Sequence, residues 1–197
     1  EWVENQFSDP EPKLIIEIGS HVGQDTAWMS MIPNVTMYCF EPDPKNRQPI
    51  RENVVVVHAA VGLIDGEVDF YPSRERYGKP YTKSGSILQP TGHLKTHPEI
   101  TFGPPIKIPI ITLDGFAEKM GLGEVAFVWI DAQGAEGEIV QGGQQLLTRT
   151  RYLYTEYSDR PLYLGQLNLT QLLERLPGWI VVHRWEYDVL LANESLS

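Results

Sequence analysis

The sequence contains little cysteine, little positive charge and no long apolar run. Among its 197 residues there is one cysteine, Cys39, so an intrachain disulfide and a zinc site built on several cysteines are both excluded. No apolar run approaches the ~20 residues that a membrane-spanning helix needs. We therefore expect no membrane span, and the sparse cysteine favours a cytoplasmic location.

Basic residues are also outnumbered. The chain has 16 Lys and Arg against 26 Asp and Glu, which gives a formal net charge of −10. Nucleic-acid binding depends on clustered Lys and Arg, so the composition argues against a nucleic-acid partner. Hydrophobic residues make up 42% and charged residues 21%, as in globular proteins. The length suits one domain, which we expect to span residues 1–197.

Short apolar blocks alternate with helical patterns along the chain. The predicted strands are residues 13–18, 35–40, 54–58, 67–71, 106–112, 125–131, 152–157, 179–183 and 187–192. The predicted helices are residues 24–32, 43–52, 113–121, 136–147 and 164–176. Strands that alternate with helices predict an α/β fold, with a mostly parallel sheet covered by helices on both faces.

Residues 72–105 have a different texture, rich in Pro, Gly, Ser, Thr and Lys and without a clear period. We expect a long loop inserted in the domain, and such loops are usually functional or disordered. Residues 72–107 hold six basic and two acidic side chains, although the whole chain is acidic. This asymmetry can steer an anionic small molecule, such as a uronic acid or a nucleotide sugar, toward this part of the domain. The predicted substrate-binding residues are Arg74, Arg76, Lys79, Tyr81 and Ser86. The alternative is a solvated loop whose charges only maintain solubility.

The first predicted strand runs into a glycine turn, IIEIGSHVGQDT, before the first helix. Gly19 and Gly23 let a ligand approach the backbone closely, and the helix start presents free N–H groups. A dinucleotide fingerprint would read G-x-G-x-x-G, whereas three residues separate these two glycines, which disfavours a pyrophosphate. The alternative is a plain strand-to-helix turn.

Two acidic residues stand at predicted strand ends. Glu41 lies 22 positions after Gly19 in the motif FEPDP, where doubly wound sheets place a carboxylate that accepts hydrogen bonds from ribose hydroxyls. Asp131 ends the most hydrophobic strand, in WIDAQGAEGEIVQGG. In open α/β sheets the carboxyl ends of the strands line the ligand crevice. The alternatives are a surface glutamate and a helix N-cap.

These motifs resemble those of the FkbM-type family of S-adenosyl-methionine-dependent methyltransferases. The matching stretches are IEIGSHVGQDT, FEPDPKNRQPIREN, VHAAVGLIDGEVDFYPS, SGSIL, ITLDGF and WIDAQGAEGEIVQGG, in the family's order over about residues 14–157. The resemblance implies a Rossmann-like class I methyltransferase fold, a seven-stranded sheet whose last strand is antiparallel. It also implies O-methylation of a hydroxyl on a sugar or other small natural-product acceptor, with S-adenosyl-methionine as cofactor.

The resemblance also assigns residues by position. It implies that the cofactor is bound by Glu17, Gly19, Ser20, His21 and Gly23 around its methionine part, by Glu41 and Pro42 at its ribose, by Ala60 near the adenine, and by Asp131 and Ala132 at the sulfonium. The family usually has Asp where Glu17 stands, Lys at Trp129 and Glu at Gln133. Glutamine at position 133 keeps hydrogen bonding but loses the charge.

Methyl transfer is an in-line displacement that depends on positioning, and an alcohol oxygen can also need a general base. We expect Asp131 and His21 to be catalytic. The other candidate bases are His58, His93 and His97. No metal site is predicted, although Asp131, Glu156 and Asp159 offer the oxygen ligands that Mg²⁺ prefers. A nicotinamide-dependent oxidoreductase and a non-catalytic nucleoside-binding module are the alternative functions.

Overall fold

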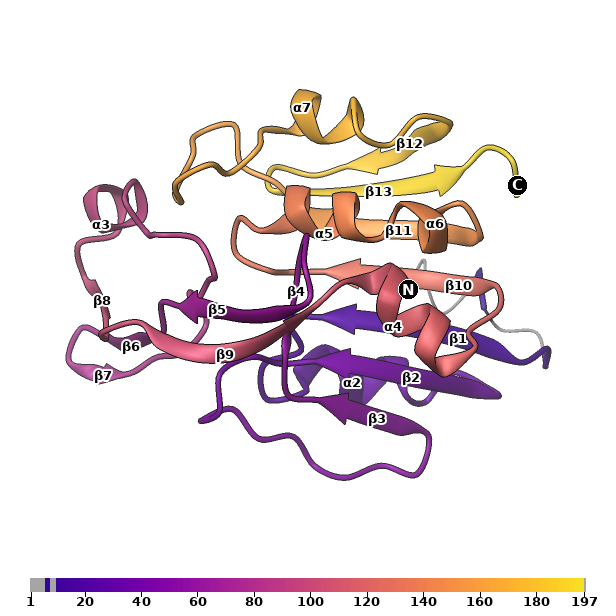
Figure 1. Cartoon of the computed structure of the whole chain (residues 1–197), viewed down its shortest axis with the longest axis horizontal. Helices are drawn as coiled ribbons and strands as arrows, with labels where there is room; N and C mark the ends of the chain where they lie inside the picture. Colours follow the sequence, from indigo (N-terminus) through magenta and orange to yellow (C-terminus); the bar gives the residue numbers. More distant parts are fainter. Residues whose placement is uncertain (1–5, 8–9, 197) are drawn as a thin grey trace.

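The computed structural model describes residues 6–7 and 10–196, so residues 1–5, 8–9 and 197 of the predicted domain lie outside the described part. The chain is built around a seven-stranded sheet with the order β12-β13-β11-β10-β1-β2-β3 (Figure 1). At its centre, β1 (Lys13–Ile18) pairs in parallel with β2 (Val35–Phe40) and with β10 (Val125–Ile130).

The sheet is mostly parallel, as predicted. Strand β3 (Val54–Val57) runs parallel to β2, and β11 (Thr150–Glu156) runs parallel to β10. Strand β13 (Asp188–Asn193) is antiparallel to both of its neighbours, β11 and β12 (Trp179–Arg184). The sheet is therefore mixed, with β13 reversed relative to the other six strands.

Helices cover both faces of this sheet. Successive side chains of a strand point to opposite faces, and apolar side chains on both faces are buried. The helices are α2 (Gln24–Met29), α3 (His93–Thr96), α4 (Leu113–Met120), α5 (Glu136–Gly142), α6 (Gln144–Leu147) and α7 (Leu169–Leu173). Ile16 and Ile18 of β1 pack in a core with residues of α4 to α7. Ile15 packs on the opposite face with Met29 of α2. None of the helices in the described residues has the length and apolar character that crossing a bilayer requires.

Two smaller sheets lie beyond the carboxyl ends of β1, β2 and β10 (Figure 1). One is formed by β4 (Ala60–Val61), β9 (Ile106–Ile111) and β5 (Gly66–Phe70). The other is formed by β7 (Lys79–Pro80), β6 (Ser73–Arg76) and β8 (Ile100–Phe102). The segment 72–105, predicted as a loop, thus contains three short strands and α3. Strands of two to four residues are too short to give a visible period in the sequence.

The helix predicted over residues 43–52 is wrong, because this segment has no helical residues. Pro49 lacks the N–H that a helix interior needs, and Asp43 Oδ1 instead accepts a hydrogen bond from the Lys45 N–H in a turn. The segment crosses the glycine turn, where Gln48 donates a hydrogen bond to Ser20. It therefore adds side chains to the region at the end of β1.

Candidate active site

A cavity opens at the carboxyl ends of β1, β2 and β10. It encloses about 850 Å³ including its open mouth, within the range of small-molecule sites. Residues that follow the three strands line it: Gly19, Ser20, His21, Glu41, Pro42, Asp131, Ala132 and Gln133. The opposite wall includes Ala60, Val61, Phe70, Thr82, Lys83, Ser86 and Ile87. The cavity thus has a polar wall along the sheet edge and a partly apolar wall on the segment beyond it.

The loops after β1 and β10 touch through their backbones. A Cβ at Gly19 would lie 1.8 Å from the backbone oxygen of Asp131, and the φ of Gly19 is +86°. The Asp131 N–H donates to the Ile18 oxygen at 2.9 Å. Because only glycine tolerates both the close approach and the positive φ, Gly19 brings the glycine turn and Asp131 to one cavity.

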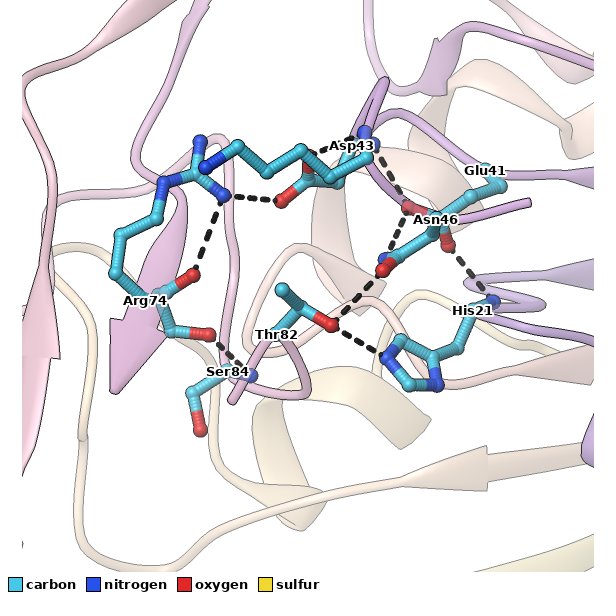
Figure 2. A network of polar contacts seen from close by, with 9 residues as sticks. His21, Glu41, Asp43, Asn46, Arg74, Thr82 and Ser84 are labelled. Atoms are coloured by element: carbon cyan, nitrogen blue, oxygen red, sulfur yellow. Dashed lines mark hydrogen bonds and ion pairs between the residues drawn. The ribbon is translucent and has the colours of Figure 1, made fainter. Parts of the chain in front are cut away.

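Glu41 presents a buried carboxylate to this cavity. Its Oε2 accepts a hydrogen bond from the His21 N–H at 2.7 Å, and its Oε1 accepts from the Asp43 N–H at 2.7 Å and from Asn46 Nδ2 at 3.0 Å (Figure 2). The pKa of Glu41 is raised by burial, and these hydrogen bonds offset only part of that effect. The carboxylate is therefore held in one orientation at the end of β2.

A polar network connects Glu41 to the segment beyond the sheet (Figure 2). Thr82 Oγ1 donates to Asn46 Oδ1 at 2.8 Å and lies 2.7 Å from His21 Nε2. Arg74 pairs with Asp43 at 2.8 Å. Because the Thr82 hydroxyl donates its hydrogen to Asn46, His21 Nε2 carries a hydrogen and donates to Thr82. The network fixes the wall that residues 82–87 contribute to the cavity.

His21 has a free acceptor in this arrangement. With hydrogen on Nε2, its Nδ1 is an acceptor, and this buried atom has no hydrogen-bond partner among the described residues. Burial lowers the pKa of His21, which favours the neutral ring. The residue has a φ of 50°, which side-chain-bearing residues rarely adopt. A buried acceptor that lacks a partner is a position where a ligand can donate a hydrogen bond.

Asp131 belongs to a second polar group at the end of β10. Gln133 Nε2 donates to Asp131 Oδ1 at 2.6 Å and to Glu156 Oε2 at 3.1 Å, and Gln133 Oε1 accepts from the Tyr163 hydroxyl at 3.3 Å. Burial raises the pKa of Asp131, and hydrogen bonds from Gln133 and Glu156 lower it. Burial and the charge of Asp131 raise the pKa of Glu156. The two neighbouring carboxyls therefore oppose each other's ionisation.

Two of the predicted cofactor residues do not line the cavity. Glu17 is buried on the α2 face, where its Oε2 accepts hydrogen bonds from Thr26 Oγ1 at 2.5 Å and from Cys39 Sγ at 3.3 Å. Gly23 has a φ of +79°, and a Cβ there would lie 2.8 Å from Gln48 Oε1. Both residues support the glycine turn from behind. The other predicted cofactor residues line the cavity: Gly19, Ser20, His21, Glu41, Pro42, Ala60, Asp131 and Ala132.

Of the predicted substrate residues, only Ser86 lines the cavity. Arg74 is paired with Asp43, and Arg76 lies 3.7 Å from Glu99 and near two tyrosine rings. Lys79 and Tyr81 are absent from the wall, which instead contains Lys83. The positive charge of residues 72–107 could not distinguish Lys83, which lines the cavity, from Arg74 and Arg76, which pair with acidic residues.

The remaining histidines lie away from the cavity wall. His58 contacts Arg47 on the surface, and His93 packs against the rings of His97, Phe102 and Tyr163. Neither His58, His93 nor His97 lines the cavity.

The magnesium ligand set is not assembled. Asp159 is exposed and pairs with Arg184 at 3.3 Å. Within the described ranges there is no group of three His, Cys, Asp or Glu that could hold a metal ion. Asp131 and Glu156 therefore form a pair that Asp159 does not join.

The groups around the cavity fit a nucleoside that carries a charged substituent. The buried Glu41 carboxylate suits the hydroxyls of a ribose, and the apolar side chains of Ala60, Phe70 and Ile87 suit a flat base. The free Nδ1 of His21 accepts one more hydrogen bond. Asp131 suits a positive charge. The fold and this cavity thus define an α/β protein with a nucleoside-cofactor site at the carboxyl edge of its sheet.

Comparisons with known proteins identify the family. The family model of the methyltransferase FkbM domain matches residues 17–189. The chain is 37% identical over 199 residues to the 2-O-methyltransferase NoeI of Sinorhizobium fredii (strain NBRC 101917 / NGR234), covering 95% of this chain and 82% of the relative. The chain therefore belongs to the FkbM methyltransferase family, and it is an S-adenosyl-methionine-dependent methyltransferase. These comparisons favour neither a nicotinamide-dependent oxidoreductase nor a non-catalytic nucleoside-binding module.

Two solved structures are among those that match this chain. The N-terminal domain of EvdMO1, in a structure with SAH and D-fucose, has a TM-score of 0.48 at 12% identity and covers 97% of this chain and 80% of that one. Precorrin-6y C5,15-methyltransferase from Geobacter metallireducens GS-15 has a TM-score of 0.46 at 12% identity and covers 97% and 86%.

Proposed function

We propose that this methyltransferase acts on the hydroxyl of a sugar or a related small acceptor. The observation that carries the proposal is that Glu41 and Asp131, from the ends of β2 and β10, line one cavity. The family and the similarity to a protein named a 2-O-methyltransferase support oxygen as the methylated atom. The topology of the main sheet supports a class I methyltransferase fold.

The cofactor supplies a methyl group that is already activated on a sulfonium. Glu41 would accept hydrogen bonds from the ribose hydroxyls, and Ala60 would contact the adenine. His21 offers its unpaired Nδ1 to a donor of the cofactor. The backbone at Gly19 and Ser20 would contact the methionine part of the cofactor. These residues orient the cofactor, which is the main contribution that an enzyme makes to an in-line displacement.

Asp131 orients the acceptor hydroxyl and takes its proton. Its Oδ1 already accepts from Gln133, so Oδ2 is the oxygen that is left for the acceptor. Lys83, in the opposite wall, lies on the exposed side and donates to Gln24 Oε1 at 3.2 Å. An acceptor with a carboxylate or phosphate, such as a uronic acid or a nucleotide sugar, would place that group near Lys83.

The proposal is tested by incubating the protein with S-adenosyl-methionine that carries a labelled methyl group. The acceptors are matched neutral sugars, uronic acids, nucleotide sugars and small phenols. We expect label on a sugar hydroxyl, with no transfer in the Asp131→Ala variant. Label only on phenols, or on nitrogen or carbon of an acceptor, would contradict the proposal. Binding of the cofactor with no transfer to any sugar would also contradict it.

A further inference from the structure

Two carboxylates from neighbouring strands meet beside the cavity. Asp131 follows β10, Glu156 ends β11, and one amide nitrogen of Gln133 donates to both, at 2.6 and 3.1 Å. Both carboxyl groups therefore lie within hydrogen-bond reach of one nitrogen atom, and two carboxylates this close repel each other when both are ionised. A proton on one of the two carboxyl groups relieves this repulsion.

Among the described residues, the charged groups that act most strongly on this pair are acidic, and Lys83 lies in the wall of the same cavity. Asp25 of α2 and Asp188 of β13 act on Asp131. Glu136 of α5 and Asp188 act on Glu156. Two tyrosines complete the surroundings: Tyr154 bonds to Asp188, and Tyr163 donates to Gln133. A positive charge beside Asp131 therefore favours ionisation of both carboxyls.

We propose that the Asp131–Glu156 pair, whose carboxyl groups Gln133 orients, shares one proton, and that the pair releases this proton when the sulfonium of the cofactor is bound beside Asp131. The inference rests on the proposed function, which places Asp131 at the sulfonium. It gives a role to Gln133, at a position where the FkbM family usually has Glu. An amide bridges two carboxylates, whereas a third carboxylate would repel them.

The charges balance over the reaction. The doubly ionised pair receives the proton of the acceptor hydroxyl when the O–H bond breaks and the new O–CH₃ bond forms. The electron pair of the S–CH₃ bond stays on sulfur, which becomes neutral. The pair gains one positive charge as the cofactor loses one, so the net charge of the site stays constant. Constant charge avoids the electrostatic penalty of creating an unpaired charge in a largely buried site.

The test compares S-adenosyl-methionine with S-adenosyl-homocysteine, which lacks the methyl group and its positive charge but keeps the other groups. Calorimetric titrations in two buffers of different ionisation enthalpy, at about pH 7.5, count the protons released. We expect S-adenosyl-methionine to release about one proton more than S-adenosyl-homocysteine. The ratio of their dissociation constants then shifts in favour of S-adenosyl-methionine by up to about tenfold per unit rise in pH.

Two variants locate the proton. Glu156→Gln keeps a hydrogen-bonding side chain but cannot ionise, so the difference between the two ligands should fall close to zero. Its affinity for S-adenosyl-homocysteine should stay within about threefold of the wild type. Asp159→Asn is the matched control, because Asp159 is an exposed carboxylate three positions away that pairs with Arg184. This control should keep the full difference.

Equal proton release by the two ligands in the wild-type protein overturns the inference, whether or not the variants fold. A full difference that persists in folded Glu156→Gln overturns it too, because the proton then comes from another group. Both results leave the proposed function standing if labelled methyl still reaches a sugar. Failure of both ligands to bind overturns the inference together with the proposed cofactor site.

Discussion

The backbone oxygen of Asp131 lies 1.8 Å from the position that a Cβ on Gly19 would occupy. Two loops that are far apart in sequence therefore meet without any side chain between them. Gly19 begins the turn proposed to hold the cofactor, and Asp131 is the residue proposed to receive the acceptor's proton. A backbone contact thus sets the distance between the turn proposed to hold the cofactor and the residue proposed to bind the methyl acceptor.

Gly19→Ala should be severely destabilising, by more than about 4 kcal/mol, because the added carbon meets backbone and the φ is positive. Urea unfolding at equilibrium measures the change. Gly123→Ala is the control, since a Cβ there meets nothing within 4 Å, and it should leave stability within about 1 kcal/mol of the wild type. Similar unfolding midpoints for the two variants would mean that the loops separate without cost.

Glu41→Ala should weaken S-adenosyl-homocysteine binding by about 1–3 kcal/mol, because hydroxyls of the ligand lose their acceptor. Calorimetry measures the affinity. Alanine also removes the acceptor of the His21 and Asp43 N–H groups, so stability should fall as well. Glu41→Gln keeps one acceptor oxygen and should separate the two effects. It should lose less stability than Glu41→Ala but should still bind S-adenosyl-homocysteine more weakly than the wild type. Unchanged affinity in Glu41→Ala would remove Glu41 from the cofactor site.

Asp131→Asn should lower kcat by at least about 100-fold, because the amide cannot take the acceptor's proton. The affinity for S-adenosyl-homocysteine should change by no more than about threefold, since the interaction is made with the acceptor. Steady-state kinetics and calorimetry on the same preparation give both values. Equal losses of kcat and affinity would identify Asp131 as a binding residue alone.

Lys83→Ala should reduce kcat/KM for an anionic sugar by about tenfold at low salt and should leave the matched neutral sugar nearly unchanged. The reason is that Lys83 lies in the cavity wall. Lys79→Ala is the control, because Lys79 is exposed and lies outside that wall. The hypothesis that the anionic group of the sugar contacts Lys83 is wrong if both substitutions have the same effect. It is also wrong if added salt does not reduce the preference for the anionic sugar.

Glu17→Gln should flatten the pH dependence of stability. Burial raises the pKa of Glu17 from 4.5 to about 7. Between these values the folded state holds a proton that the unfolded state has lost, so stability falls as pH rises through this window, by about 3 kcal/mol in all. Thermal unfolding at about pH 5 and pH 8 should show a smaller loss in Glu17→Gln than in the wild type. The substitution of exposed Glu67 by Gln should leave the wild-type dependence intact.

Local signals were sufficient for the main sheet and for part of the site. Apolar runs bounded by Gly and Pro predicted strands at residues 13–18 and 35–40, and these are the bounds of β1 and β2. Because parallel strands end at one edge, strand-end positions alone placed Glu41 and Asp131 at a common cavity. The same argument could not see that Glu17 points to the opposite face, toward Thr26 and Cys39.

Contacts between distant segments decided the rest. Arg74 is a basic residue in sequence, but its pairing with Asp43 makes it part of the cavity's support. Residues 43–52 carry a weak helical pattern, yet they pack across the glycine turn in an irregular path. Asp131 and Glu156 become a proton-sharing pair only because β10 and β11 are neighbours in parallel register and Gln133 reaches both. Periodicity and composition record which side chains can be buried or charged, whereas the charge that a group carries depends on the neighbours that folding brings to it.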